Sequence, residues 1–315
     1  MHQLQLLSQN GKISLVSKLS KLMKYTVKDL RVDFPDEEAC LEWLVNYLYP
    51  DGIPCKRCEK VTKHHKIKRR RVYSCDWCGT QVSPTAGTIF HKSSAPLTDW
   101  FHAIWLMSSN KAGTSAKQIE QEINVSYPTA FRMMHKIRKM MEAPDGLLEG
   151  SIEADETYVH ANTFKRSSAR RRYGYDARRT GQIVFGILQR GGTAKVWHVP
   201  HTNGELLMQF FRENVKYGST VYTDGYLAYR DLPKIGYEHK STDHGKRQWV
   251  DFQDPANNTQ NIENLWSHFK RGIKGVYRHI SAKHLQKYAD EYAWRYSHRG
   301  DVSMFWSLMG RVGKS

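Results

Sequence analysis

The stretch Asn261-Ile-Glu-Asn-Leu-Trp-Ser-His-Phe-Lys270 has the apolar spacing of an amphipathic helix. At 100° per residue its apolar face carries Ile262, Leu265, Trp266, Phe269 and Ile273. Glu263 and Lys270 are seven residues apart, about two helical turns, so both lie at the edge of that face. A helix buried by this face would hold one carboxylate and one ammonium group at the rim of the surface that it covers. The alternative is a solvated charge pair beside a core face.

Two aspartates upstream of this helix belong to strand-like runs. Residues 151–158 alternate between apolar and polar positions and place Asp155 on the polar face, and residues 219–224 form a short run that ends at Asp224. Hard divalent cations prefer oxygen ligands, and two-metal phosphodiester chemistry needs carboxylates on converging elements. Asp155, Asp224 and Glu263 are therefore candidate ligands for two Mg²⁺ or Mn²⁺ ions, although spacing alone leaves open whether they meet.

The remaining runs of residues 149–300 alternate between strand-like and helix-like patterns. Two strands flank Gly191-Gly192 as a hairpin, a helix follows near Leu206, and a last strand lies around Tyr237. Hairpin strands, a helix, a strand and a carboxylate-bearing helix are the element order of a ribonuclease-H-like α/β fold. We therefore predict this fold, with a mixed sheet.

Four of the five cysteines form two close pairs, Cys55-Lys-Arg-Cys58 and Cys75-Asp-Trp-Cys78, with sixteen residues between them. This spacing is typical of a structural zinc site, in which four thiolates complete a tetrahedron and leave no open position for chemistry. The alternative is four unligated thiols. We predict one structural Zn²⁺ in a zinc ribbon, within a reducing compartment.

A basic run between the cysteine pairs contains Arg69, Arg70 and Arg71. On a zinc ribbon such a run is expected to contact phosphates, although a solvated charge run is the simpler interpretation. Residues 165–179 form a second basic run, which includes Arg170, Arg171 and Arg172 and has no apolar periodicity. We expect this second run to be a DNA-contacting loop.

Three helical patterns follow Pro96. The second opens at Ser115-Ala-Lys-Gln118, which has the form of a capping box, and the third follows the turn Asn124-Val-Ser126. A short helix, a tight turn and a basic helix make a helix-turn-helix candidate, although many three-helix bundles share this pattern. Three basic residues are predicted to face away from the apolar stripe of the third helix and to contact DNA, namely Arg132, Lys136 and Lys139; Arg138 is expected on the same side.

The whole chain is strongly basic, with 48 Lys and Arg against 31 Asp and Glu and a formal charge of +17. Such an excess favours a polyanionic partner, with nucleic acid first and an anionic membrane surface second. No run of about 18 apolar residues suggests a membrane span, and the N-terminus lacks the pattern of a secretory signal. We expect a protein that is not secreted and acts in the cytoplasm or nucleoid of a prokaryote, or in the nucleus of a eukaryote.

These patterns divide the chain into five parts. They are a basic N-terminal arm (1–32), a helix plus zinc ribbon (33–92), an all-α helix-turn-helix domain (93–148), the ribonuclease-H-like domain (149–300) and a C-terminal tail (301–315).

As a set, the motifs resemble those of DDE transposases in the insertion-sequence group that includes the eukaryotic Merlin elements. The matching stretches run in order from about Asp33 to Arg299. They are Phe34-Pro-Asp-Glu-Glu38, Pro50-Asp-Gly52, both cysteine pairs, Gly87-Thr-Ile-Phe-His91, Pro96-Leu-Thr98, Glu153-Ala-Asp-Glu-Thr-Tyr158, Tyr222-Thr-Asp-Gly225, Ile262-Glu-Asn-Leu-Trp266 and Lys270-Arg-Gly272.

The resemblance implies a protein that binds double-stranded DNA, both the terminal inverted repeats of an element and its target, as a homo-oligomer. It implies metal-dependent strand cleavage and transfer, with Asp155, Asp224 and Glu263 as the catalytic triad and Lys270 acting beside it. Two departures stand out. Gln260 occupies the place where relatives usually carry Asn, which leaves Asn261 as a lesser catalytic candidate, and His160-Ala161 replaces a frequent Gly-Gly.

Two other classes of protein remain open from the sequence. A domesticated transposase could bind DNA as a regulator without transposition, since the ribbon and the helix-turn-helix would suffice for that role. A ribonuclease or RNA-binding protein could use the same catalytic fold, but the chain lacks the aromatic signature of an RNA-recognition module. The three carboxylates favour the enzyme over the regulator.

Overall fold

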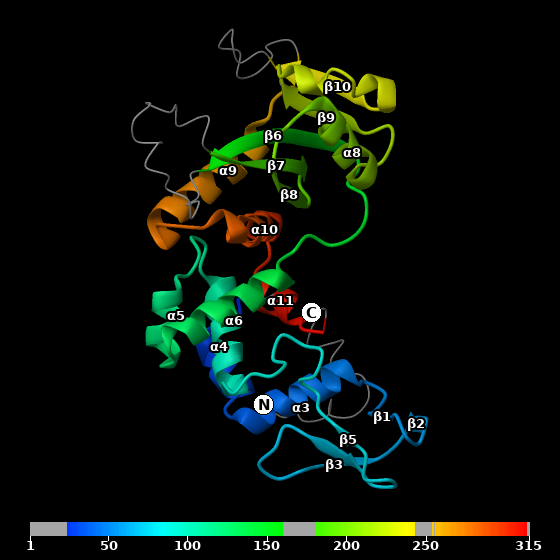
Figure 1. Cartoon of the computed structure of the whole chain (residues 1–315), viewed down its shortest axis with the longest axis vertical. Coiled ribbons are helices and arrows are strands. Elements are labelled where there is room, and N and C mark those ends of the chain that lie inside the picture. The colour runs from blue at the N-terminus through cyan, green and yellow to red at the C-terminus, as the bar shows by residue number, and fades with distance from the viewer. Residues whose placement is uncertain (1–23, 160–180, 243–253, 255, 314–315) are drawn as a thin grey trace. The chain divides into compact units, whose positions relative to one another are not determined.

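The computed structural model describes residues 24–159, 181–242, 254 and 256–313. The chain divides into two compact units, each described here by itself (Figure 1). The first comprises residues up to Met140 together with Gly300 onward, and the second comprises Met141–Arg299. No helix among the described residues is long and apolar enough to cross a membrane.

Five short strands of the first unit surround the two cysteine pairs. β1 and β2 form one antiparallel pair, and β3, β4 and β5 form a three-stranded antiparallel sheet. Their bounds are β1 Pro54–Cys55, β2 Lys60–Val61, β3 His64–Lys66, β4 Tyr73–Cys75 and β5 Gln81–Val82. Each cysteine pair ends in a residue of positive φ, Glu59 after the first and Gly79 after the second. The two turns are therefore built alike, and each presents its sulfur atoms to the other.

Helices form the rest of the first unit. They are α2 Val27–Asp33, α3 Glu37–Leu48, α4 Leu97–Ser109, α5 Ala116–Ile123, α6 Tyr127–Met140 and α11 Met304–Met309. The predicted helix start after Phe34 is confirmed, because Asp36 caps α3 by accepting from the Ala39 amide. Ser115 likewise accepts from the amide of Gln118 at the start of α5. Helices α4, α5 and α6 pack against one another.

Both ends of the described chain are more ordered than the sequence predicts. Part of the expected N-terminal arm forms α2, and Tyr25 before it stacks on Phe305 of α11 with ring centroids 4.8 Å apart. The expected C-terminal tail contains α11, which packs against α4 and buries Phe305 and Leu308. Residues 300–313 therefore complete the core of the first unit. This role depends on partners far away in the sequence.

The second unit is built on a five-stranded mixed sheet, as predicted. Its strands are β6 Ser151–Val159, β7 Gln182–Gln189, β8 Ala194–Val199, β9 Thr220–Asp224 and β10 Glu238–Thr242, in the order β10-β9-β6-β7-β8. β6, β7 and β8 are antiparallel neighbours, which confirms the hairpin predicted around Gly191, whereas β9 runs parallel to β6 and β10. The carboxyl end of β9 therefore lies beside the middle of β6.

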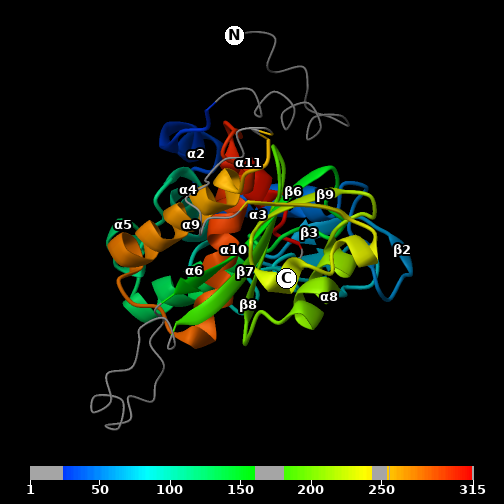
Figure 2. The same ribbon diagram turned by 90° about the horizontal axis from the view of Figure 1, so that it is seen from above.

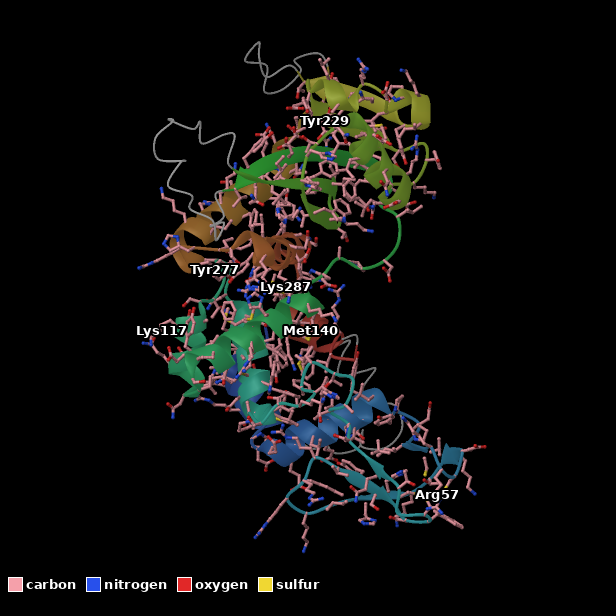
Figure 3. The ribbon with its side chains drawn as sticks, viewed as in Figure 1. Arg57, Lys117, Met140, Tyr229, Tyr277 and Lys287 are labelled. Carbon is pink, nitrogen blue, oxygen red and sulfur yellow. The ribbon has the colours of Figure 1, made fainter. Side chains whose placement is uncertain are left out.

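Helices cover the two faces of this sheet (Figures 1 and 2). α8 Gly204–Asn214 packs on one face, in a core that includes Ile152 and Tyr229. α9 Gln260–Gly272 and α10 Leu285–Ser297 pack on the other, where Tyr277 lies against the core; Tyr229 and Tyr277 are labelled in Figure 3. The predicted apolar stripe of α9 is buried along its whole length. This burial orients the polar edge of α9 relative to β6.

Candidate active site and metal centre

Asp155 lies near the middle of β6, on the face of the sheet that α9 covers. Burial, followed by the negative charges of Glu156, Asp224 and Glu263, raises the pKa of the Asp155 carboxyl to about 8. Asp155 of β6 therefore lies within electrostatic range of a carboxylate from β9 and of one from α9. The structure brings together the three acidic residues that the sequence singled out.

The other two carboxylates are held by local hydrogen bonds. Asp224 is the last residue of β9, and its Oδ1 accepts from the Tyr226 amide at 3.0 Å. Glu263 lies in the first turn of α9, where its Oε1 accepts from the Thr259 hydroxyl at 2.8 Å. Among the described residues, only the cysteine cluster has three or more candidate ligand atoms all within 4.8 Å of one another. The oxygen atoms of the three carboxylates are therefore not all within 4.8 Å of one another, unlike the sulfur atoms of the four cysteines.

Trp266 of α9 connects the helix directly to Asp155. Its indole N–H donates to Asp155 Oδ2 at 3.0 Å. Asp155 pairs across the sheet with Gly186 of β7, and a Cβ added at Gly186 would lie 2.7 Å from two atoms of the Trp266 ring. The missing side chain at Gly186 therefore creates the space that the indole ring occupies against the sheet.

Replacing Gly186 with Ala is expected to displace Trp266 and to reduce stability. Overpacking of a filled core typically costs about 1–3 kcal/mol, and the shift would separate the indole from Asp155. Thermal melts would measure the loss. Gly275→Ala is the matched control, because a Cβ at Gly275 meets nothing within 4 Å. Equal melting temperatures for Gly186→Ala and Gly275→Ala would contradict this account.

The N-terminus of α9 is held by Glu153, two residues before Asp155 and on the same face of β6. The Glu153 side chain is fully buried and accepts from the Asn261 side chain at 2.8 Å and from the Ile262 amide at 2.9 Å. Arg190 donates to the same carboxylate at 2.7 Å and also to the carbonyls of Ala256 and Asn258. Because the Glu153 carboxylate is buried, removing one of its partners would leave an uncompensated charge and would be strongly destabilising. The network therefore sets the position of α9, and with it that of Glu263.

Three other candidate residues occupy different surroundings. Asn261, the lesser catalytic candidate, links Glu153 to the hydroxyl of Tyr296. Glu156 accepts from the buried hydroxyl of Tyr229 at 2.8 Å. Lys270 is exposed on α9, and no hydrogen bond or ion pair is recorded for it within the described ranges.

Sequence reasoning missed Glu153, Arg190, Gly186 and the polar role of Trp266. Gly186 offered a signal, because an isolated glycine inside a strand indicates a close approach. Trp266 belongs to an apolar stripe and was interpreted as core alone. Arg190 precedes the Gly191-Gly192 turn, and nothing in its local pattern indicates a buried partner.

Asp155→Asn is expected to stabilise the metal-free protein increasingly as pH rises. The folded-state pKa of about 8 exceeds the ordinary 3.8, so the wild-type protein loses stability from near the lower value up to the higher one. The advantage of the variant should grow across that window and then level off, with roughly 2–4 °C in Tm for each kcal/mol.

Melting curves without divalent ions, recorded at several pH values, would test this prediction. Asp231→Asn is the control, because the hydrogen bond from Lys234 lowers the pKa of that partly exposed carboxyl. Its effect should not grow with rising pH in this way. A constant difference in Tm between Asp155→Asn and the wild type at every pH would contradict the prediction.

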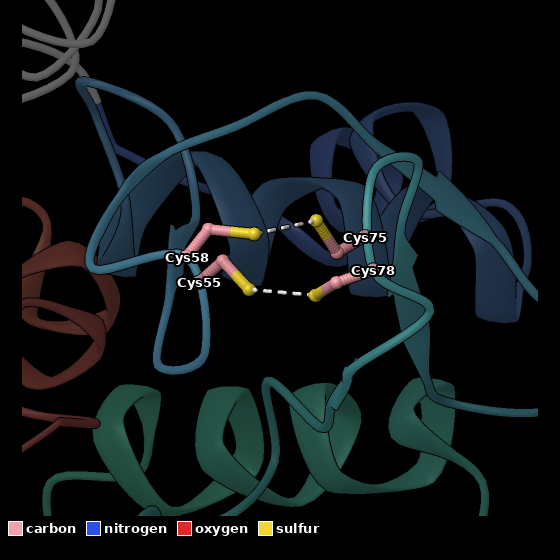
Figure 4. Close-up of side chains that lie close together, drawn as sticks. All are labelled: Cys55, Cys58, Cys75 and Cys78. Carbon is pink, nitrogen blue, oxygen red and sulfur yellow. Dashed lines mark hydrogen bonds between the residues drawn. The ribbon is translucent and has the colours of Figure 1, made fainter.

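The four predicted zinc ligands converge from the two matched turns (Figure 4). Cys55 and Cys78 sulfurs are 3.4 Å apart, and Cys58 and Cys75 sulfurs are 4.0 Å apart. A Zn–S bond of about 2.3 Å in a tetrahedron places sulfurs roughly 3.8 Å apart, so these separations fit Zn²⁺. A hydrogen bond with Thr80 lowers the pKa of Cys78 to about 6, which favours the thiolate. A hydrogen bond with Cys78 raises the pKa of Cys58 to about 12, which favours the thiol. Deprotonation of all four sulfurs therefore calls for a cation among them.

Several basic residues expected to contact DNA are instead engaged inside the first unit. Arg71 pairs with Glu37 and donates to the carbonyls of Ser93 and Ala95. Lys136 donates to the carbonyls of Ile89 and His91, at 2.8 and 3.0 Å. The placement of Arg138 on the outer side of its helix is wrong, because only 1% of its surface is exposed.

Other basic candidates keep exposed side chains: Arg69, Arg70, Arg132 and Lys139. Arg170, Arg171 and Arg172 lie outside the described residues.

Two family models match separate parts of the chain. Residues 35–81 match a transposase zinc-ribbon domain, and residues 147–297 match an ISXO2-like transposase domain. The first match contains both cysteine pairs, and the second contains Asp155, Asp224 and Glu263.

Two related proteins agree with these models. The chain is 27% identical over 255 residues to an uncharacterised protein in the transposable element ISH50 of Halobacterium salinarum, covering 76% of this chain and 86% of that protein. It is 30% identical over 99 residues to an uncharacterised transposase-like protein of Haemophilus influenzae, covering 31% and 76% of the two chains. Among solved structures, the Mos1 transposase paired-end complex with the left transposon end is similar at 13% identity and a TM-score of 0.27, covering 68% of this chain and 79% of that one.

Together, the matched domains and relatives define a zinc-ribbon transposase of a mobile DNA element. The chain belongs to the ISXO2-like transposase family, which confirms the resemblance to insertion-sequence transposases noted in the sequence.

Proposed function

We propose that this transposase binds the terminal inverted repeats of its element and catalyses metal-dependent strand cleavage and strand transfer at Asp155, Asp224 and Glu263. The observation that carries the proposal is the placement of the buried Asp155 carboxyl on β6 close to Asp224 of β9 and Glu263 of α9. Burial first, and then the negative charges of Glu156, Asp224 and Glu263, raise the pKa of Asp155 to about 8. Perturbed carboxyl groups gathered at one place are typical of catalytic sites. The strand order and directions of the second unit support a ribonuclease-H-like assignment for this domain.

The donor set suits two Mg²⁺ or Mn²⁺ ions, because it consists of carboxylate oxygens that repel one another until a cation is bound. When bound, such ions polarise the phosphodiester and generate a strong nucleophile for direct attack. The chain contributes orientation. Trp266 holds Asp155, Thr259 holds Glu263, and the Glu153–Arg190 pair fixes α9 on the sheet. Lys270 would contact DNA phosphate beside the site.

We assign DNA recognition to the first unit, with α5, its short turn and α6 acting as a helix-turn-helix. Asn124 in the turn adopts the left-handed conformation, and Arg132 and Lys139 are exposed on α6. Arg69 and Arg70 extend from the zinc ribbon. Transposition joins two element ends to a target, so a homo-oligomer would assemble on the DNA, in the nucleoid or the nucleus according to the host.

Alanine at Arg132 or Lys139 is expected to weaken specific sites more than random DNA, by about 1–3 kcal/mol where a base contact is lost. Alanine at both Arg69 and Arg70 should weaken binding to all sequences alike. The slope of log K against log salt concentration should become shallower by about 0.9 for each phosphate contact removed. Binding curves on terminal-repeat and scrambled duplexes at several salt concentrations measure both quantities.

The control for this comparison is Lys234→Ala, an exposed lysine paired with Asp231 in the second unit. It should change neither quantity. If the ribbon variant lost discrimination and the α6 variants lost only uniform affinity, the assigned roles of the ribbon and α6 would be reversed.

The proposed activity is tested by incubating the protein with duplexes that carry the inverted repeats flanking its gene. Nicking with Mg²⁺ or Mn²⁺, absent in EDTA, is expected, followed by joining of the released 3′ end to a target duplex. Binding without nicking under any divalent ion would favour a domesticated DNA-binding regulator. Equal cleavage of RNA would favour a ribonuclease.

A further inference from the structure

Trp77 is a large apolar side chain that the first unit leaves uncovered. It lies between Cys75 and Cys78 in the second cysteine turn, and 75% of its surface is exposed. Its backbone is held between two zinc ligands, so the ring extends from a rigid support. With 75% of its surface exposed, this tryptophan contributes little to the core, and its ring is accessible to a binding partner.

The surroundings of Trp77 are predominantly basic. Lys60, which follows the first cysteine turn, places its Nζ over the indole ring, 5.2 Å from the ring centroid. Lys56 and Arg57 are exposed in that same turn, and Figure 3 labels Arg57. Two acidic residues are sequence neighbours of Trp77 and Lys60. Asp76, which precedes Trp77, is paired with His65 at 2.6 Å, and Glu59 precedes Lys60. The two cysteine turns therefore present an aromatic ring together with three cations.

We propose that Trp77 and Lys60 form a binding site for an unpaired DNA base and its phosphate. Aromatic side chains beside cationic groups bind single-stranded nucleic acid by stacking, while the cations contact the backbone. A base inside a duplex has both faces covered by its neighbours, so the indole ring requires a frayed end or an overhang. The inference rests on the proposed function, because strand cleavage at element ends is the step that exposes such bases.

The test is fluorescence anisotropy with the full-length, zinc-loaded protein and no other divalent ion. Two dye-labelled duplexes are compared, one blunt and one with a short single-stranded overhang. The wild-type protein is expected to bind the overhang about tenfold more tightly, in line with stacking of one base. Trp77→Ala should remove this preference, and Trp77→Phe should retain several-fold of it. Leu227→Ala, which removes an apolar side chain that is also 75% exposed, should leave the preference unchanged.

Three results would overturn the proposal. They are a wild-type protein with no preference for the overhang, a Trp77→Ala protein that keeps the preference, and a Trp77→Ala protein weakened equally on both duplexes. If Trp77→Ala holds less than one zinc, Lys60→Ala decides, because Lys60 lies outside both cysteine pairs. An unchanged preference in Lys60→Ala then rejects the site. Because no catalytic ion is present, the outcome is independent of whether Asp155, Asp224 and Glu263 support cleavage.

Discussion

Alanine at Asp155, Asp224 or Glu263 is expected to abolish strand cleavage while leaving affinity for the element ends nearly unchanged. Each substitution removes a carboxylate from the proposed metal site, and metal ions supply several kcal/mol of transition-state stabilisation. Because 1.36 kcal/mol corresponds to a factor of ten, the rate should fall on the order of 10³-fold or more. Single-turnover cleavage rates and binding curves for the same proteins separate the two effects.

Glu149→Ala provides the control for these three variants. Glu149 is exposed, lies in the same unit and pairs with Lys216 at 2.9 Å, so its loss should leave the cleavage rate within about twofold, as expected of a surface ion pair. Normal cleavage by Glu263→Ala would show that Glu263 is dispensable and would shift the third role to Glu156 or Asn261. Since the Asn261 side chain already donates a hydrogen bond to Glu153, a catalytic role for Asn261 would also require α9 to rearrange.

Removing zinc is expected to unfold the ribbon from about Cys55 to Cys78 and to weaken binding to the element ends. The strands of the ribbon contain only two or three residues each, so its fold depends on the metal, which can contribute on the order of 10–16 kcal/mol. The second unit should stay folded, because its core is separate. Chelation and Cys75→Ser should give the same result in limited proteolysis and zinc analysis.

Cys40→Ala distinguishes loss of zinc from loss of any cysteine. Cys40 is buried in α3 and does not belong to the four-cysteine cluster. Its replacement should retain one zinc equivalent per chain and full DNA affinity. Purified, folded wild-type protein without zinc would refute the structural role of the metal.

Features that depend on local periodicity and short spacing could be predicted from the residues alone. The apolar stripe of α9 is buried as predicted because side chains at helical spacing share one face whatever they pack against. Strand alternation likewise put Asp155 on the face opposite Ile152, and the spacing of the cysteine pairs indicated a zinc ribbon. The element order of the second unit followed from the same local patterns.

Contacts between residues that are far apart in the chain could not be predicted in this way. Trp266 became a partner of Asp155 because the register of β6 and β7 puts Gly186 beneath its ring. The local sequence around Arg71 and Lys136 predicts exposed cations. In the structure, their side chains donate hydrogen bonds to carbonyl groups of residues more than twenty positions away in the chain. Such pairings depend on how elements pack and on which polar groups burial leaves in need of partners. The polar support of the site is therefore a property of the packed structure, whereas the sequence named its three carboxylates as candidates and left open whether they meet.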